Sequence, residues 1–183
     1  MNIVVLSGSP RKGANTDTMV EAFAETAREA GHAVEVVRVA SKKIAGCLGC
    51  QYCFAHKGTC VQKDDMMKIY PVYREADIVV LASPMYYWGI SGQLKTAFDR
   101  LFAVAELSPD YENPHKACAL LMSAEGDTAD NFAPVRAFYE GLTSHLGWEN
   151  IGIVYAGGNM EAGEILSKDA QLEEAEKLGR SIS

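Results

Sequence analysis

Short apolar runs alternate with longer amphipathic segments along this chain, and the alternation repeats five times. The short runs are rich in Val, Ile and Leu and too short for helices, whereas the longer segments place apolar residues at helical spacing. The predicted strands are residues 2–6, 33–39, 77–82, 116–123 and 149–156. The predicted helices are residues 16–30, 64–75, 91–105, 132–146 and 167–178. This alternation predicts an α/β fold built on a parallel sheet with right-handed crossovers.

The length of the chain, 183 residues, is that of one domain, so residues 1–183 are assigned to a single domain. Its formal net charge of −7 argues against a sequence-independent nucleic-acid binder, which needs clustered positive charge. No apolar run is long enough to cross a membrane, and the N-terminus lacks the features of an export signal. We therefore expect a cytoplasmic protein that binds neither nucleic acid nor membrane.

The segment between the first predicted strand and the first predicted helix has the parts of an anion-binding loop. Two glycines, a basic pair and several hydroxyl or amide side chains precede a helix N-terminus. The candidate contacts are Ser9, Arg11, Gly13, Asn15 and Thr16. The Lys and hydroxyl residue of a nucleoside-triphosphate loop are replaced by Ala14-Asn15, so the pattern favours a monophosphate-bearing ligand. An ordinary turn with Asn15 or Thr16 as the N-cap residue is the alternative.

The loops after the third and fourth predicted strands are the next candidates, because ligands of parallel sheets bind beyond the carboxyl ends of the strands. The first loop supplies Pro84, Met85, Tyr86, Tyr87, Trp88 and Gly89, and the second supplies Ser123, Glu125 and Gly126. Three consecutive aromatic residues cannot all point into one core, so at least one is expected to line a surface or a pocket. Capping of the sheet or a subunit interface is the alternative role for these rings.

Three stretches carry a family resemblance: GSPRKGANT, EADIVVLASPMYYWGISGQLKTAFDR and the SAEG that ends the fourth strand. Together they resemble the NADPH-dependent FMN reductase and iron–sulfur flavoprotein branch of the flavodoxin-like superfamily, over almost the whole chain. The resemblance implies a three-layer α/β/α flavodoxin-like fold with a five-stranded parallel sheet of order 2-1-3-4-5. It also implies FMN as cofactor and a homodimer or homotetramer. In such a site Ser9, Arg11, Asn15 and Thr16 hold the phosphate, residues 84–89 lie along the ring and ribityl chain, and residues 123–126 approach the ring's other edge.

Four cysteines form the pattern C-x₂-C-x₂-C-x₆-C within the segment 46–61, which is inserted after the second predicted strand. They are Cys47, Cys50, Cys53 and Cys60. Three thiolates at this spacing can surround one corner of a cubane cluster and a fourth can close the site, as in the compact motif of iron–sulfur flavoproteins, which this pattern resembles. The alternatives are a zinc site, metal-free reduced thiols and a thiol–disulfide pair. Cys118, in the apolar run of the fourth strand, is predicted to be a buried apolar residue.

These features lead to an enzyme as the first hypothesis: an FMN-dependent NAD(P)H oxidoreductase. Hydride would pass from the nicotinamide to bound FMN and on to a small acceptor such as a flavin or a quinone. Hydride transfer to a flavin needs stacking and orientation rather than a protein acid or base, so no catalytic residue is assigned. The alternatives are an iron–sulfur flavoprotein or flavodoxin-like carrier that passes single electrons between protein partners, and a redox sensor that responds through its cysteines.

Overall fold

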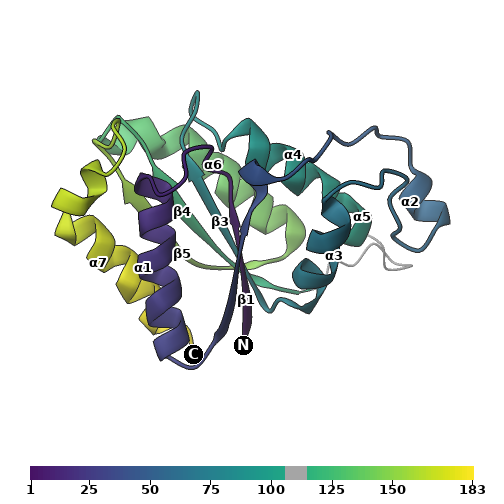
Figure 1. The fold of residues 1–183 in the computed structure, drawn as a ribbon, viewed down its shortest axis with the longest axis horizontal. Helices are drawn as coiled ribbons and strands as arrows, with labels where there is room; N and C mark the ends of the chain where they lie inside the picture. The colour runs from purple at the N-terminus through teal and green to yellow at the C-terminus, as the bar shows by residue number, and fades with distance from the viewer. Residues whose placement is uncertain (106–114) are drawn as a thin grey trace.

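The computed structural model describes residues 1–105 and 115–183. Five parallel strands form one sheet in the order β2-β1-β3-β4-β5 (Figure 1). The strands are β1 (Asn2–Ser7), β2 (Ala33–Arg38), β3 (Ile78–Pro84), β4 (Ala117–Ser123) and β5 (Glu149–Ala156). The predicted fold class, strand order and strand positions are therefore confirmed, with the strand ends shifted by a residue or two.

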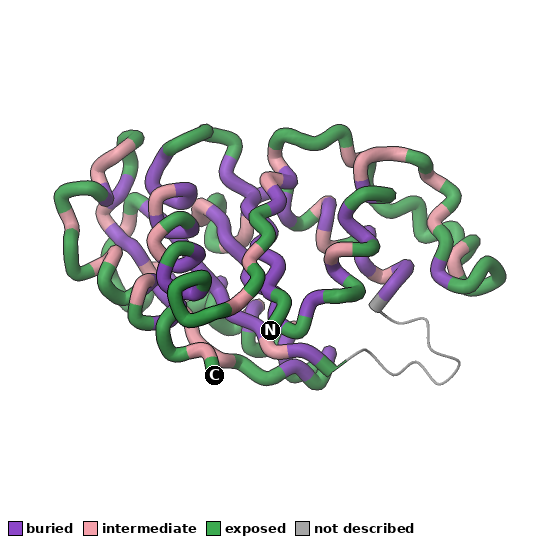
Figure 2. Tube along the Cα trace, turned by 60° about the horizontal axis from the view of Figure 1, so that its bottom comes forward, coloured by how far each residue is buried: buried purple, intermediate pink, exposed green. Residues whose placement is uncertain are grey.

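Helices cover both faces of the sheet and complete the three layers (Figure 1). One face is covered by α1 (Asn15–Glu29) and α7 (Asp169–Ser181), and the other by α3 (Met66–Glu75), α4 (Gly92–Arg100) and α6 (Ala129–Leu146). Within β1, Ile3 and Val5 pack on the α1 side while Val4 and Leu6 pack on the α3 side. Successive side chains of a strand point to opposite faces, so a sheet covered on both faces needs continuous apolar strands. Figure 2 shows the resulting buried strands at the centre of the molecule.

The predicted helix 91–105 is two helices in the structure, α4 and the one-turn α5 (Phe102–Ala105). The N–H of Leu101 donates to the carbonyl of Phe98, an i to i−3 bond that tightens the end of α4 and ends its regular ladder. At the other end of α4, the hydroxyl of Ser91 accepts a hydrogen bond from the N–H of Leu94 and caps the helix.

The cysteine-bearing segment lies between the short 3-10 helix η1 (Val39–Ser41) and α3, and it contains one helical turn, α2 (Tyr52–Ala55). Figure 1 shows this segment extending away from the sheet beside α4 and α5. A second 3-10 helix, η2 (Glu164–Ser167), precedes α7. No helix within the described ranges is long and apolar enough to span a membrane.

Candidate functional site

Two adjoining cavities lie beyond the carboxyl ends of β1, β3 and β4. The first has a volume of about 260 Å³ and is lined by Ser9, Arg11, Ala14, Asn15, Thr16, Pro84, Met85, Tyr86, Ser123, Ala124, Glu125, Asn159 and Met160. The second has a volume of about 300 Å³ and is lined by Met85, Tyr86, Tyr87, Trp88, Ala124, Glu125, Gly126 and Asn131. They share lining residues from both loops and form one surface. We call them the loop cavity and the aromatic cavity. Every predicted cofactor-contact residue except Gly13 and Gly89 lines one of the two.

Gly13 shapes the loop that precedes α1. Its φ of +68° is in the left-handed region that favours glycine, and its N–H donates to Asp17 Oδ2 over 2.8 Å. Asp17 is buried and forms an ion pair with Arg38 from β2. The N-cap residue of α1 is Ala14, which has no side-chain cap. The prediction of Asn15 or Thr16 as the N-cap residue is therefore wrong. The first-turn N–H groups of α1 are the part of the loop suited to an anion.

The side chains of Asn15 and Arg11 are already engaged by the segment that follows β5. Asn15 Nδ2 donates to the carbonyl of Glu161 over 2.8 Å, and Asn15 Oδ1 accepts from the N–H of Gly163 over 2.9 Å. Arg11 Nη1 donates to the carbonyl of Met160 over 2.8 Å. Both residues line the loop cavity while joining two distant segments of the chain.

Asn159 is a cavity residue that the sequence reasoning missed. It is buried, it lines the loop cavity, and its Oδ1 has no hydrogen-bond partner among the described residues. Its Nδ2 is held by the carbonyl of Gly157 over 3.0 Å and by Gln171 Oε1 over 2.8 Å. The signal was available, because Asn159 follows the carboxyl end of β5, where the same rule about parallel sheets applies. A buried acceptor without a partner is suited to a ligand hydroxyl.

Two serines brace the loop after β3. The hydroxyl of Ser83 accepts from the N–H of Ser91 over 2.8 Å, and the hydroxyl of Ser91 donates to the carbonyl of Gly8 over 2.8 Å. The N–H of Met85 donates to the carbonyl of Ser123 over 2.7 Å. The loops after β1, β3 and β4 are thus joined by direct hydrogen bonds below the cavities.

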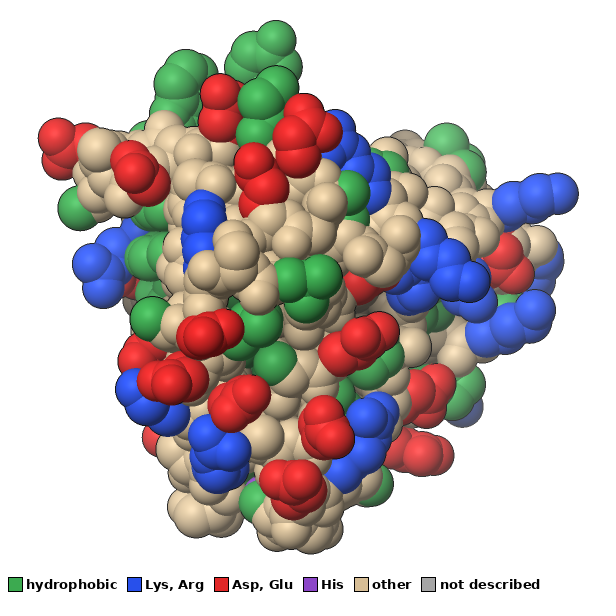
Figure 3. Space-filling model, turned by 60° about the vertical axis from the view of Figure 1, so that its left-hand side comes forward, with side chains coloured by type: hydrophobic (Ala, Val, Ile, Leu, Met, Phe, Trp, Pro, Cys, Tyr) green, Lys and Arg blue, Asp and Glu red, His purple; other side chains and the backbone are tan. Residues whose placement is uncertain are grey.

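The aromatic loop is a tight hairpin. Tyr86 and Gly89 exchange both backbone hydrogen bonds, at 3.0 and 3.1 Å, which leaves Tyr87 and Trp88 as the two central residues. Their φ angles are +48° and +61°, a geometry that favours Asn-Gly and strains bulky residues. Tyr87 is 95% exposed and Trp88 is 55% exposed, so the prediction that the three rings do not all enter the core is confirmed. Figure 3 shows hydrophobic side chains projecting at the top of the molecule, the side on which Figure 1 shows the loop between β3 and α4.

The four clustered cysteines all line a third cavity, of about 540 Å³, together with residues of α4 and α5. We call it the cysteine cavity. Cys47 and Cys50 are exposed, Cys53 and Cys60 are half-buried, and all four are free thiols. Within residues 1–105 and 115–183, no three His, Cys, Asp or Glu side chains are close enough together to hold a metal ion. The structure thus gathers the predicted ligands around one space without arranging them in a coordination geometry. Cys118 is a buried residue of β4, as predicted.

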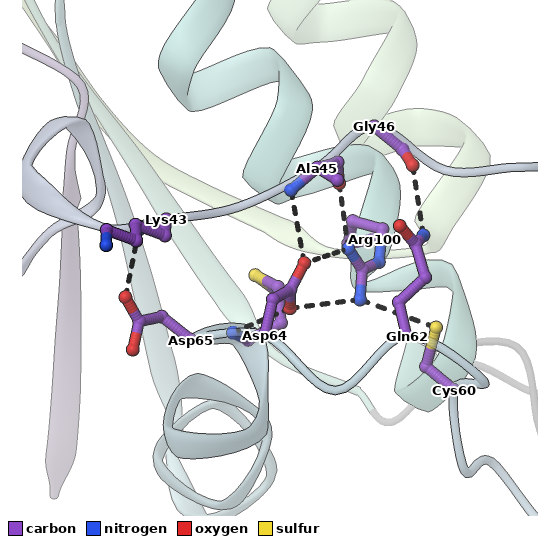
Figure 4. Close-up of polar contacts among 9 residues, drawn as sticks. Lys43, Ala45, Gly46, Cys60, Gln62, Asp64, Asp65 and Arg100 are labelled. Atoms are coloured by element: carbon purple, nitrogen blue, oxygen red, sulfur yellow. Dashed lines mark hydrogen bonds and ion pairs between the residues drawn. The ribbon is translucent and has the colours of Figure 1, made fainter.

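An ion pair between Arg100, which lines the cysteine cavity, and the half-buried Asp64 joins α4 to the base of the cysteine-bearing segment (Figure 4). The guanidinium of Arg100 donates to both carboxylate oxygens of Asp64, from Nη1 over 2.6 Å and from Nη2 over 3.2 Å. Partial burial alone would raise the pKa of Asp64, but the hydrogen bonds from Arg100 and from the N–H groups of Ala45 and Met66 outweigh it and lower the pKa. The predicted site residues did not include this pair.

A comparison of the sequence with a protein-family model, over most of the chain, shows the family. The family model described as NADPH-dependent FMN reductase matches residues 1–156. The chain belongs to this family. Membership in the FMN reductase family confirms the predicted resemblance and supports the prediction of an NAD(P)H-dependent flavin oxidoreductase.

Curated relatives of this member of the FMN reductase family are named iron-sulfur flavoprotein. One from Archaeoglobus fulgidus is 45% identical over 101 residues, which are 55% of this chain and 46% of that protein. One from Methanosarcina thermophila is 39% identical over 100 residues, 55% of this chain and 52% of that protein. These two matches span about half of each relative. A third, from Methanocaldococcus jannaschii, is 29% identical over 196 residues, 100% of this chain and 96% of that protein.

Solved structures with the same fold include oxidoreductases. An NAD(P)H:quinone oxidoreductase from Methanothermobacter marburgensis superposes with a TM-score of 0.77 at 21% identity, over 97% of this chain and 94% of that one. An FMN-dependent NADH-azoreductase from Bacillus anthracis superposes with a TM-score of 0.70 at 13% identity, over 97% of both chains. At these identities the comparison establishes the shared fold.

Proposed function

We propose that the chain is an FMN-dependent NAD(P)H oxidoreductase that passes hydride from a nicotinamide to bound FMN and on to a small acceptor, such as a flavin or a quinone. The observation that carries the proposal is that the loop cavity and the aromatic cavity adjoin each other. The first offers a helix N-terminus and hydroxyl groups for a phosphate, and the second offers exposed rings for a flat heterocycle. Family membership supports the same reaction class.

The residues of the cavities fit the parts of FMN in order. The first turn of α1, with Ser9 and Thr16, would hold the phosphate. Oδ1 of Asn159, which is buried and unpaired among the described atoms, would accept a hydrogen bond from a ribityl hydroxyl. The hairpin would support the ring. Bound FMN supplies the hydride-accepting chemistry, while the protein supplies position and water exclusion.

The carboxylates of the loop after β4 are not assigned to acid–base catalysis. Glu125 and Asp127 are both exposed, and a flavin needs no protein proton donor to accept hydride. Arg11 has a different task in this proposal. Its guanidinium is held by the carbonyl of Met160 at the rim of the loop cavity, where its positive charge would favour a bound phosphate.

An iron–sulfur flavoprotein that transfers single electrons is the second candidate function. The observation that favours it is the cysteine cavity, where four thiols of suitable spacing line one space. Thiolates are the donors that iron–sulfur clusters use, so the donor set fits, and Cys47, Cys50, Cys53 and Cys60 would be the ligands. We also propose a homodimer or homotetramer, with the exposed rings of Tyr87 and Trp88 in its interface.

Steady-state turnover separates the two candidates. The purified chain, reconstituted with FMN, is mixed with NADPH and a quinone, and the oxidation of NADPH is followed by absorbance. The oxidoreductase predicts sustained oxidation, whereas a pure electron carrier gives none until a separate reductase is added. The double variant Ser9→Ala, Thr16→Val should retain less FMN and turn over more slowly. The matched surface variant Arg136→Gln, whose side chain pairs with Glu140 on the exposed face of α6, should behave as the parent chain.

A further inference from the structure

Arg100 is the least exposed charged residue in the described part of the chain, at 2%. It stands at the end of α4 and lines the cysteine cavity. Burying a guanidinium is costly unless its donors are paired, so its partners indicate what it does. Its hydrogen-bond partners in Figure 4 are Ala45, Cys60 and Asp64, which lie before, within and after the segment 46–61 that carries the cysteines.

The partners of Arg100 lie on both sides of the cysteine segment. On the incoming side, Nη1 donates to the carbonyl of Ala45 over 2.7 Å. On the outgoing side, the guanidinium pairs with Asp64, and Nη2 lies 3.4 Å from Cys60 Sγ. Arg100 therefore holds the start and the end of the segment together.

Further hydrogen bonds close the same base (Figure 4). The N–H of Lys43 donates to Asp65 Oδ2 over 2.9 Å, and Gln62 Nε2 donates to the carbonyl of Gly46 over 3.0 Å. Cys60 lies on this closed base, whereas Cys47 and Cys50 are exposed farther along the segment. The sulfur of Cys60 accepts its hydrogen bond from a buried charged side chain, whereas the sulfur of Cys47 accepts one from the backbone N–H of Gly49 over 3.5 Å.

A hydrogen bond from a guanidinium to sulfur is of most use when the sulfur is anionic. Charged hydrogen bonds are about twice as strong as neutral ones. Hydrogen bonds to ligating sulfurs also help to set the reduction potential of an iron–sulfur cluster, and groups that orient ligands contribute to metal retention. Arg100 combines these properties because it is charged, buried, anchored by Asp64 and directed at Cys60.

We propose that Arg100 is a positioning residue for an iron–sulfur cluster: it fixes Cys60 as the fourth ligand and donates a hydrogen bond to its sulfur. This inference rests on the iron–sulfur candidate in the proposed function. Arg100 does not contact the iron itself. Its effect passes through Cys60 Sγ and through the closed base of the segment.

The test uses the full chain, reconstituted without oxygen with ferrous iron and sulfide. The parent chain is compared with Arg100→Gln, Arg100→Lys and the surface control Arg136→Gln. Iron per chain, the rate of iron loss to a chelator, and the midpoint potential of the cluster are measured, the last by a redox titration followed by electron paramagnetic resonance. Resistance of the buried Cys118 to alkylation reports whether each variant is folded.

The proposal predicts that Arg100→Gln loses iron about tenfold faster than the parent chain and has a lower cluster potential. Arg100→Lys, which keeps the charge but not the planar fork, should fall between the two and carries the test if Arg100→Gln does not fold. Parental iron loss and an unchanged potential in both variants would overturn the proposal, even if thermal stability falls. If the parent chain takes up no iron, the iron–sulfur candidate fails with it, whereas NADPH turnover still tests the flavin function.

Discussion

The hydroxyl oxygens of Thr16 and Ser123 lie 2.7 Å apart, although 107 positions separate the two residues in the chain. Thr16 is in the first turn of α1, and Ser123 is the last residue of β4. Both are buried and both line the loop cavity. This hydrogen bond therefore joins the predicted phosphate loop to the loop that is predicted to approach the ring.

Replacing Thr16 with Val should lower both stability and FMN affinity. The substitution keeps the side-chain shape but leaves the buried Ser123 hydroxyl without this partner, a cost of about 1–3 kcal/mol in the free energy of unfolding. Urea unfolding measures the first effect and a flavin titration the second. Thr143→Val is the matched control, since Thr143 is also buried but its hydroxyl donates to carbonyls of its own helix, α6. Equal FMN affinity in the two variants would remove Thr16 from the site.

A substitution at Gly8 tests how closely the loops are packed below the loop cavity. A Cβ at Gly8 would clash with the Ser91 hydroxyl and lie 2.6 Å from Leu94 Cβ. We expect Gly8→Ala to destabilise the fold by about 1–3 kcal/mol and to weaken FMN binding. Gly92→Ala, at the start of α4 with open space around it, should be neutral or stabilising. Thermal unfolding of the pair is the measurement, and a smaller loss for Gly8→Ala than for Gly92→Ala would contradict the packing.

The sheet could be predicted from sequence because each strand is a continuous apolar run bounded by polar turns, as in the stretch from Ile78 to Ala82. The residues of the candidate site were predicted for the same reason, since they follow three of these strands. The hydrogen bonds that their side chains make could not be predicted from the sequence. Asn15 and Arg11 bind backbone groups of residues 160–163, and contacts across such a separation leave no pattern in local sequence.

The hairpin should become more stable when its central residues suit its geometry. Tyr87 and Trp88 occupy left-handed backbone conformations that Asn and Gly adopt more easily. The double variant Tyr87→Asn, Trp88→Gly should gain about 1–2 kcal/mol of stability through relief of strain. It should also bind FMN less tightly and turn over more slowly, because the exposed rings are gone. Calorimetry measures the stability and NADPH oxidation measures the turnover. Unchanged turnover would show that the two rings do not contribute to the reaction.

The pairing of Arg100 with Asp64 illustrates what sequence patterns cannot supply. The residues are 36 positions apart and belong to different predicted elements. Only the folded arrangement of α4 against the start of α3 brings them together, and the same arrangement places Cys60 beside the guanidinium. The cysteine spacing alone predicted candidate ligands but not which of them the protein holds in place.

Asp64 should make stability depend on pH in the acid range. Its pKa is lowered in the folded state, so the unfolded state binds more protons as the pH falls. The stabilisation is present above the ordinary pKa of an aspartate and is lost as the pH falls through the lowered value. Stability of the parent chain should therefore decline below about pH 4 more steeply than that of Asp64→Asn. Urea midpoints across a pH series measure this, and parallel profiles would show that the carboxylate is not stabilised.

The most direct test of the account compares the affinities of the flavin-free chain for FMN and for riboflavin, which has the same ring and ribityl chain but no phosphate. Quenching of flavin fluorescence in a titration gives both dissociation constants. If the loop before α1 holds the phosphate, FMN should bind at least about tenfold more tightly, a difference of about 1.4 kcal/mol. Equal affinities, or no binding of either flavin, would contradict the central claim.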